Sequence, residues 1–262
     1  MPLLKLLLAV VLLSALAAVA ETTEEVIRLP SADGAVQPYL LSRERDRDYH
    51  LAAILFTGGA GELGLLTRGI PSPGANFLVR SRQLFVDQGI ATAVIDAPSD
   101  QRTMNDSLRM GGRHQDDVAA VLRDLQLRLP KVRVFLVGTS RGTVSAAYVG
   151  AALGSEPSGV VLSSSLFIAS REGAGLSGFD FSRIAAPLLF VHHAEDSCRF
   201  TPYAAAARLG EHYPLITVRG GTSPRSGPCE PFNAHGYFGR EAETVKAIAG
   251  WMAGKPYAKM IE

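Results

Sequence analysis

Short apolar runs alternate along the chain with longer segments that carry apolar residues on one side. The apolar run at residues 51–56 and others like it predict buried parallel strands, because helices cover both faces of such a strand. The predicted strands span residues 26–43 (two strands around a turn at 32–34), 51–56, 91–95, 132–137, 159–163, 187–192 and 215–218, and the predicted helices span 76–88, 115–129, 143–153, 203–212 and 238–252. This alternation predicts an α/β fold with a mostly parallel, doubly wound sheet and helices on both faces.

The first 20 residues have the layout of a secretory signal peptide. Lys5 precedes an apolar stretch at residues 6–17, and the small residues Ala18 and Ala20 flank Val19. The stretch is short for the roughly 20 residues that span a bilayer, which argues against the alternative of an uncleaved membrane anchor. We therefore expect cleavage after Ala20, export to a bacterial periplasm or the medium, and no membrane span in the mature chain.

Residues 21–262 read as a single domain, because no repeat, low-complexity tract or linker divides them. Once Lys5 is removed, 25 basic and 25 acidic side chains remain. A neutral chain has no bulk attraction for nucleic acid or for an acidic membrane. The predicted partner is a small-molecule or acyl substrate.

The most informative motif is Gly138-Thr139-Ser140-Arg141-Gly142, which lies between a predicted strand and a predicted helix. A sharp strand-to-helix turn raises the serine hydroxyl above the sheet edge, beside the positive end of the helix. Glycines two positions before and after the serine leave room for such a turn. Ser140 is therefore the candidate nucleophile.

A serine hydroxyl needs an imidazole to accept its proton, and the imidazole needs an acid to orient it. Asp196 follows the strand at 187–192, on the sheet edge where Ser140 is expected. His235 lies next to Gly236, in a loop before the last predicted helix. We expect His235 to act as base and Asp196 as the orienting acid, with the neighbouring Glu195 as the alternative acid.

The order Ser140, Asp196, His235 resembles that of the α/β-hydrolase superfamily across nearly all of residues 21–262. The resemblance implies the α/β-hydrolase fold. It also implies an oxyanion hole formed by the backbone N–H of Arg141 and a second N–H after the strand at 51–56, from Gly59 or alternatively Ala60. The connection at residues 164–186 resembles a flexible segment that could form a small lid, but it is too short for a separate cap domain.

The two cysteines flank the candidate catalytic loops. Cys198 lies two residues after Asp196, and Cys229 lies six residues before His235. An even number of cysteines in an exported chain favours a disulfide over two buried free thiols. Such a bridge would tie the acid loop to the histidine loop.

Three other features suggest competing chemistry. Residues 59–64 match G-x-G-x-x-G, but Pro71 and Pro73 follow where a phosphate-binding helix would have to begin, so the loop is better interpreted as the oxyanion loop. The adjacent His192 and His193 point to opposite faces of an extended chain, which argues against a metal site. His114 is expected at the surface. We predict neither a cofactor nor a metal.

Together these patterns predict an exported serine hydrolase that cleaves an ester, thioester or amide through an acyl-enzyme on Ser140. Two alternatives remain. One is a catalytically silent binding protein with the same fold, since a fold does not guarantee chemistry. The other is an acyltransferase that uses the same three residues.

Overall fold

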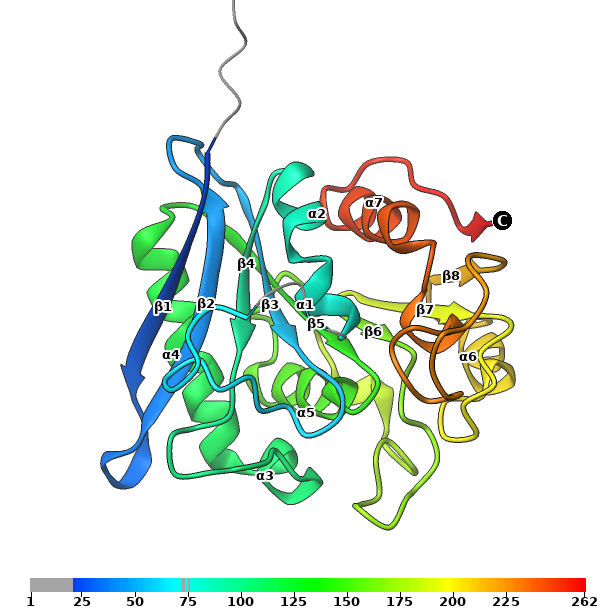
Figure 1. The fold of residues 1–262 in the computed structure, drawn as a ribbon, viewed down its shortest axis with the longest axis horizontal. Helices are drawn as coiled ribbons and strands as arrows, with labels where there is room; N and C mark the ends of the chain where they lie inside the picture. The colour runs from blue at the N-terminus through cyan, green and yellow to red at the C-terminus, as the bar shows by residue number, and fades with distance from the viewer. Residues whose placement is uncertain (1–20, 72–73, 75) are drawn as a thin grey trace, which may run out of the picture.

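The computed structural model describes residues 21–71, 74 and 76–262, so the predicted signal peptide at residues 1–20 lies outside the described residues. One nine-stranded sheet runs through the described part in the order β1-β2-β4-β3-β5-β6-β7-β8-β9 (Figure 1). Strands β1 and β2 and strands β2 and β4 pair antiparallel, and every later pair is parallel. The strands are β1 (Thr22–Pro30), β2 (Val36–Glu44), β3 (Leu51–Phe56), β4 (Ile90–Ile95), β5 (Arg133–Thr139), β6 (Gly159–Ser163), β7 (Leu188–His193), β8 (Leu215–Val218) and β9 (Met260–Ile261). The predicted mostly parallel sheet is confirmed.

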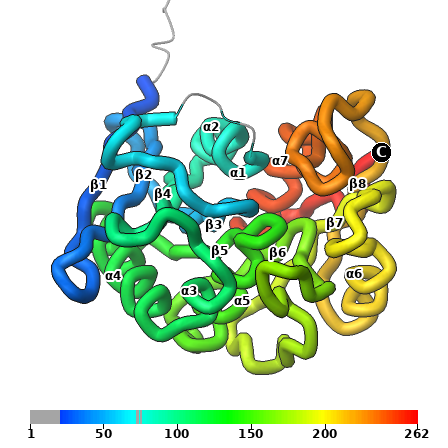
Figure 2. Tube along the Cα trace, turned by 60° about the horizontal axis from the view of Figure 1, so that its bottom comes forward, coloured from blue at the N-terminus to red at the C-terminus, as the bar shows by residue number. Residues whose placement is uncertain are grey.

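Helices cover both faces of the sheet. Figures 1 and 2 show α2 and α7 on one face and α4 and α5 on the other. Successive residues of β3 enter different cores, because side chains alternate across a strand: Ile54 joins the core under α4 and α5, and Leu55 the core under α2 and α7. The helices are α1 (Phe77–Arg80), α2 (Arg82–Asp87), α3 (Asp106–Met110), α4 (Gly112–Arg128), α5 (Gly142–Leu153), α6 (Tyr203–Leu209) and α7 (Glu241–Met252).

Several element boundaries differ from the prediction. The single helix expected at residues 76–88 is two helices, because Ser81 leaves the helical conformation at φ −96° and ψ 1°. The last helix begins at Glu241 and not at residue 238, since Tyr237 and Gly239 have φ values of +59° and +83°. The prediction also missed α3 and β9, which are too short to show a periodic pattern.

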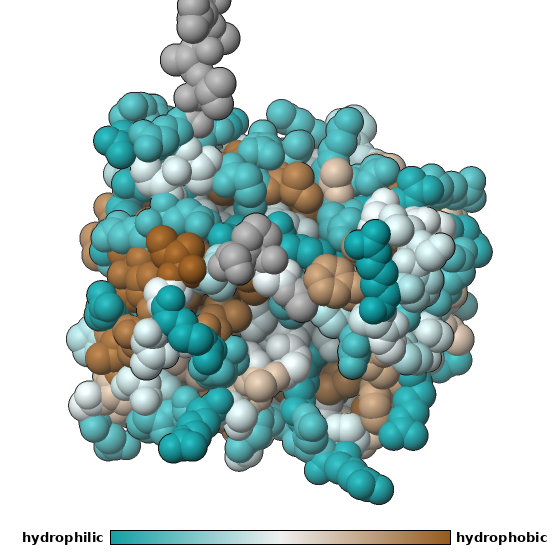
Figure 3. Space-filling view, viewed as in Figure 1, coloured by the Kyte–Doolittle hydropathy of each residue, from teal (hydrophilic) through white to brown (hydrophobic). Residues whose placement is uncertain are grey.

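Apolar side chains are largely enclosed between these layers. The face seen in Figure 3 is mostly polar, with apolar surface gathered at its left. Among the described residues, the exposed large hydrophobic side chains are Ile70, Leu127, Ile168 and Met260. Of these, Ile168 belongs to the candidate site.

The prediction that His114 lies at the surface is wrong. Helix α4 begins three residues earlier than expected, so His114 falls in its first turn and faces inward, fully buried. Its ring packs edge-on against Phe56 at 5.8 Å, and neither ring nitrogen has a hydrogen-bond partner among the described residues. Burial, and secondarily the Arg109 guanidinium, lower the pKa of His114 to about 3.

His114 gives folding a dependence on pH. Below pH 6.5 the unfolded chain binds a proton at this position, whereas the folded chain does not until about pH 3. The free energy of unfolding therefore falls with decreasing pH, by about 1.4 kcal/mol per pH unit for each such histidine. In the variant His114→Leu we expect the free energy of unfolding to fall less steeply with decreasing pH. The variant should therefore be more stable than the parent, by a difference that grows below pH 6.5.

Urea unfolding of both proteins between pH 8 and pH 4.5 measures this difference. Above pH 7 the margin should be constant, which provides the internal control. Parallel stability curves across the whole range would contradict the assignment.

Candidate active site

Ser140 lies between β5 and α5 in a sharp turn, with a backbone φ of +53° that non-glycine residues rarely adopt. A Cβ atom on Gly138 would lie 2.5 Å from the carbonyl oxygen of Gly142, and a Cβ atom on Gly142 would lie 2.0 Å from the carbonyl oxygen of Phe56. Both positions therefore require glycine. The turn has the form of a nucleophile elbow.

The folded chain brings Ser140, His235 and Asp196 together from three separate loops. The Ser140 Oγ atom lies 3.0 Å from Nε2 of His235, and Nδ1 of the same ring lies 3.0 Å from Oδ2 of Asp196. The side chains of His235 and Asp196 are 6% and 0% exposed, so water hardly competes for the second contact. The three groups form a continuous hydrogen-bonded relay.

The surroundings of Asp196 determine which nitrogen of His235 carries the proton. The Cys198 amide and the Thr201 hydroxyl donate to the two carboxylate oxygens at 2.9 and 2.8 Å. An ionised carboxylate only accepts hydrogen bonds, so the N–H of His235 is at Nδ1 and donates to Asp196. This tautomer leaves Nε2 free to accept the proton of Ser140.

The rival acid, Glu195, lies away from the histidine. It is exposed, and its carboxylate accepts a hydrogen bond from the Gly220 amide at 3.5 Å. Its own amide donates to Nδ1 of His193. Of the two adjacent carboxylates, only Asp196 lies within hydrogen-bonding distance of His235.

The candidate oxyanion hole lies between the elbow and the loop after β3. Gly59 lines both cavities that meet at Ser140, whereas Ala60 lines neither and its carbonyl accepts a hydrogen bond from Met104. Within the described residues, the backbone N–H groups of Gly59 and Arg141 donate to no other atom of the chain. This arrangement favours Gly59 over Ala60 as the second donor.

A buried arginine supports the oxyanion loop from below. Arg109, 1% exposed, donates to the carbonyls of Met104, Thr57 and Gly59 and to the Ser145 hydroxyl. Burial, and secondarily repulsion from a neighbouring arginine, lower the pKa of Arg109. No sequence pattern predicts this role for Arg109, because its partners are scattered along the chain and only the fold brings them together.

The Arg141 side chain forms ion pairs within the protein. Its guanidinium pairs with Asp106 at 3.1 Å and with Glu172. Asp106 also accepts a hydrogen bond from the Gly175 amide at 2.9 Å, which ties the connection at residues 164–186 to α3. In this connection Leu166 and Leu176 are buried, so the segment expected to resemble a flexible lid is anchored to the fold.

The structure contains a disulfide between Cys198 and Cys229, which joins the acid loop to the histidine loop. It closes a sequence separation of 31 residues. Such a crosslink stabilises a fold by about 3–4 kcal/mol, in the chain-entropy model, by restricting the unfolded chain.

We expect the double variant Cys198→Ala/Cys229→Ala to lose about 3–4 kcal/mol of unfolding free energy. Urea denaturation measures the loss. The oxidised parent is the reference, and the parent treated with a reductant should approach the variant, because Cys229 is exposed. A loss below about 1 kcal/mol would show that the bridge contributes little to stability.

His192 and His193 make separate contacts with different loops. His192 is buried, its Nε2 accepts a hydrogen bond from the Ser165 amide at 3.0 Å, and its ring stacks on Phe167. Burial lowers the pKa of His192 to about 3. The ring of His193 contacts the Gly220 carbonyl oxygen at 2.9 Å. Across the described ranges, no group of three or more His, Cys, Asp or Glu side chains is placed to hold a metal ion.

The histidine loop has a further support that the sequence analysis missed. The Ser164 hydroxyl donates to the His235 carbonyl at 2.8 Å and lies 3.0 Å from the Tyr237 hydroxyl. The Tyr237 hydroxyl donates to the Val191 carbonyl of β7 at 2.7 Å. These contacts fix the backbone that carries His235, and no local sequence motif predicts them.

Asp96 supports the oxyanion loop rather than a substrate. It accepts hydrogen bonds from the amides of Ala97, Leu63 and Leu65. The first contact caps the turn that follows β4. The other two hold the chain that follows the glycines of residues 59–64, where residues 65–68 form a turn and not a helix.

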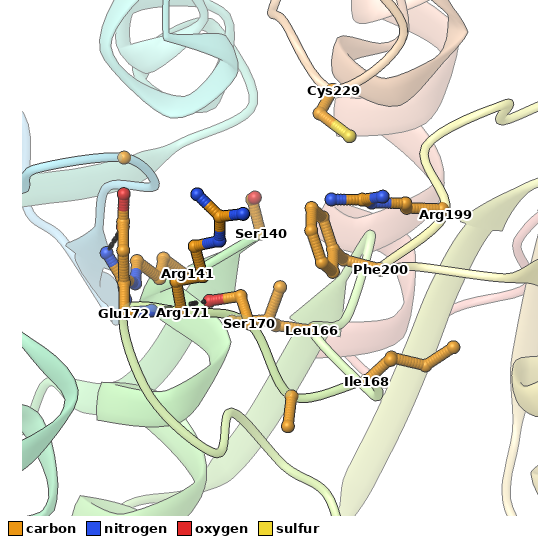
Figure 4. A pocket seen from close by; sticks show the side chains of 12 residues that line it. Ser140, Arg141, Leu166, Ile168, Ser170, Arg171, Glu172, Arg199, Phe200 and Cys229 are labelled. Carbon is orange, nitrogen blue, oxygen red and sulfur yellow. Dashed lines mark hydrogen bonds and ion pairs between the residues drawn. The ribbon is translucent and has the colours of Figure 1, made fainter.

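Two cavities meet at Ser140. The smaller, about 310 Å³, is lined by His235 as well as Ser140. The larger, about 770 Å³, is lined by Ser140 but not by His235 (Figure 4). The larger cavity is lined by Gly59, Ser140, Arg141, Leu166, Ile168, Ala169, Ser170, Arg171, Glu172, Arg199, Phe200 and Cys229.

No protein-family model and no curated protein matches the chain. Solved structures do match. A serine hydrolase without a lid from Xanthomonas campestris is 19% identical, with a TM-score of 0.59 over 89% of this chain and 97% of that one. A serine hydrolase homologue from Coxiella burnetii is 13% identical, with a TM-score of 0.60 over 86% and 95%.

A cold-adapted esterase from an Arctic intertidal metagenomic library also matches, at 18% identity and a TM-score of 0.55 over 76% of this chain and 85% of that one. These likenesses, with the sheet order and the elbow, show that the chain has the α/β-hydrolase fold. In the part that the structure describes, no helix has the length and apolar character needed to cross a membrane.

Proposed function

We propose that the protein is a serine hydrolase that cleaves an ester, thioester or amide through an acyl-enzyme on Ser140. The observation that carries this proposal is the relay of two 3.0 Å contacts from Ser140 through His235 to Asp196 at a strained elbow. The similar solved structures include proteins described as esterases and serine hydrolases, which supports the same class of reaction.

In the first half of the proposed reaction, the Ser140 oxygen attacks the substrate carbonyl carbon while its proton passes to Nε2 of His235. The negative charge that develops on the carbonyl oxygen is stabilised by the N–H groups of Arg141 and Gly59. Collapse of the tetrahedral intermediate breaks the bond to the leaving group, which takes the proton from His235. The acyl group is then bound to Ser140 as an ester.

In the second half, water attacks the acyl-enzyme and gives a proton to His235. The bond to Ser140 breaks, the serine regains its proton, and the carboxylic acid leaves. Asp196 remains ionised throughout and stabilises the charged imidazole. No cofactor takes part in these steps.

A fluorophosphonate probe tests the proposed nucleophile directly, because an activated serine oxygen displaces its fluoride and becomes phosphonylated. We expect one equivalent of label on the peptide that contains Ser140, together with turnover of p-nitrophenyl butyrate. The variant His235→Ala should lose both. The control variant Thr222→Ala changes an exposed side chain that is hydrogen-bonded to none of the three catalytic residues, and it should lose neither. A folded protein without label or turnover would overturn the proposal in favour of a silent binding protein.

We also propose export with cleavage after Ala20. The disulfide supports this, because such bridges persist in oxidising compartments. Expression in a bacterial host followed by intact mass measurement of the periplasmic fraction should give a chain that begins at Glu21. Recovery of the uncleaved chain from the membrane fraction would contradict export in soluble form.

A further inference from the structure

We propose that the substrate is an ester, thioester or amide whose acyl group ends in a carboxylate, bound in the larger cavity by Arg171 and Arg199. This inference rests on the proposed hydrolase function and adds the chemical class of the acyl group. The observations behind it are the charge balance around Ser140, the placement of the two arginines, and the division of the site into two cavities.

Four charged groups next to the nucleophile neutralise one another. Arg141 pairs with Asp106 and Glu172, and the buried Arg109 lies close enough to Asp106 for their charges to interact. Two positive and two negative charges leave no net charge in this cluster. The guanidinium of Arg141, the cation next to Ser140, is therefore neutralised by carboxylates of the protein itself.

Arg171 and Arg199 are different. Both line the larger cavity, and neither forms an ion pair with a carboxylate among the described residues. They come from two loops, one in the connection at residues 164–186 and one after β7, and in Figure 4 they enter from opposite sides of Ser140. Of the charged cavity-lining residues, these two retain an unbalanced positive charge in a protein that is otherwise nearly neutral.

Arg199 is held in place without using its hydrogen-bond donors. Its guanidinium lies over the ring of Phe200, 4.6 Å from the ring centre. This cation–π contact draws the guanidinium to the ring face, and none of its N–H groups donates to another of the described residues. A planar guanidinium with free donors can bind a carboxylate through two parallel hydrogen bonds.

The two cavities distinguish the acyl side from the leaving-group side. The leaving group must receive a proton from His235, and His235 lines only the smaller cavity. The acyl group then extends into the larger one, where Leu166, Ile168 and Phe200 provide apolar surface for a chain. The arginines therefore meet the acyl end of the substrate.

The smaller cavity has the opposite character. It contains a carboxylate, Glu230, whose side chain accepts a hydrogen bond from the Gly227 amide at 3.1 Å. A negative group on the leaving-group side would repel an anionic leaving part. The charges thus favour an anion at the acyl end only.

A matched pair of substrates tests the inference. Mono-p-nitrophenyl adipate carries a free carboxylate at the acyl end, and p-nitrophenyl methyl adipate replaces it with a neutral ester of similar length. For the parent we expect kcat/KM to be at least about tenfold higher for the anionic substrate. A hydrogen bond between charged groups stabilises a complex by about 1.5–3 kcal/mol, and about 1.4 kcal/mol corresponds to a factor of ten. Raising the salt concentration from 50 to 500 mM should reduce this ratio, because the arginines are exposed.

The variants Arg171→Gln and Arg199→Gln should each lower the ratio at least about threefold, and the double variant should bring it near one. The ratio compares two substrates on the same variant, so a change that affects both esters alike does not alter it. The control is Arg208→Gln, which removes the same charge from α6, outside both cavities, and should keep the parent ratio. A parent ratio near one, or variants that keep a high ratio, would overturn the inference while leaving the hydrolase function intact.

If neither ester is hydrolysed and the fluorophosphonate probe leaves Ser140 unlabelled, the proposed function fails and binding decides the inference. Calorimetry with the Ser140→Ala variant compares monomethyl adipate with dimethyl adipate under the same conditions. Tighter binding of the monoester that Arg199→Gln removes would support a carboxylate site in a silent protein. Equal binding of the two, or none, would overturn it.

Discussion

Replacing Ser140 with alanine is expected to lower kcat for ester hydrolysis by about 10⁶-fold, because the variant has no nucleophile for the proton relay to activate. The Ser140 hydroxyl lies 3.0 Å from Nε2 of His235, which lines the smaller cavity. Residual activity of about 10³-fold over water should remain, since the backbone donors of the oxyanion hole are unaffected. Alanine has a Cβ like serine, so the elbow keeps its backbone.

Initial rates with p-nitrophenyl butyrate, together with circular dichroism to confirm folding, measure this effect. The matched control is Ser197→Ala, an exposed serine near the acid loop, which should retain parent activity. A loss smaller than about 100-fold in folded Ser140→Ala would mean that another group carries the reaction.

Replacing Asp196 with asparagine is expected to lower kcat by about 10⁴-fold while the fold is kept. The asparagine side chain presents an N–H₂ group that turns the preferred tautomer of His235 around, so that Nε2 carries the proton and cannot accept another from Ser140. The imidazolium that forms during reaction also loses its negative partner. Because Asp196 is a hydrogen-bonded carboxylate with no exposed side-chain surface, water cannot replace it.

The neighbouring acid provides the matched control. Glu195→Gln should change kcat less than twofold, because its carboxylate is exposed and contacts only the Gly220 amide at 3.5 Å. Rates measured across pH 6–10 distinguish a lost tautomer from general damage, since hydroxide partly replaces the missing base at high pH. If Glu195→Gln caused the larger loss, the assignment of the acid would be wrong.

The central strands of the sheet could be predicted from the sequence because buried strands consist of short runs of apolar residues. Runs such as residues 51–56 and 134–137 are apolar on both faces, as is typical of a strand between two layers of helices. The boundaries were less accurate where a single residue leaves the helical conformation, as at Ser81 and Tyr237. The placement of His114 failed for a different reason: α4 begins three residues earlier than predicted, which puts His114 inside the first turn of the helix.

The elbow was predictable because the sharp turn at Ser140 needs glycine two residues before and two residues after the serine. This pattern is visible within five consecutive residues. The acid was predictable only as a pair, Glu195 and Asp196, because adjacent residues in a turn share the same local signal. The structure separates them by the position of His235, 39 residues away from Asp196 in the chain. The support that Arg109 gives to the oxyanion loop left no sequence signal at all.

The sequence by itself thus determined the alternation of strands and helices, the serine at the turn, and the set of residues from which its partners could come. The tertiary structure alone decided that Asp196 faces His235, that Arg141 is neutralised by two carboxylates, and that Arg171 and Arg199 are left unbalanced beside the nucleophile. The physical reason is the distance along the chain over which each effect acts. Hydrophobic periodicity and backbone strain act between near neighbours in the chain, whereas hydrogen bonds and ion pairs depend on distances that only the folded chain sets.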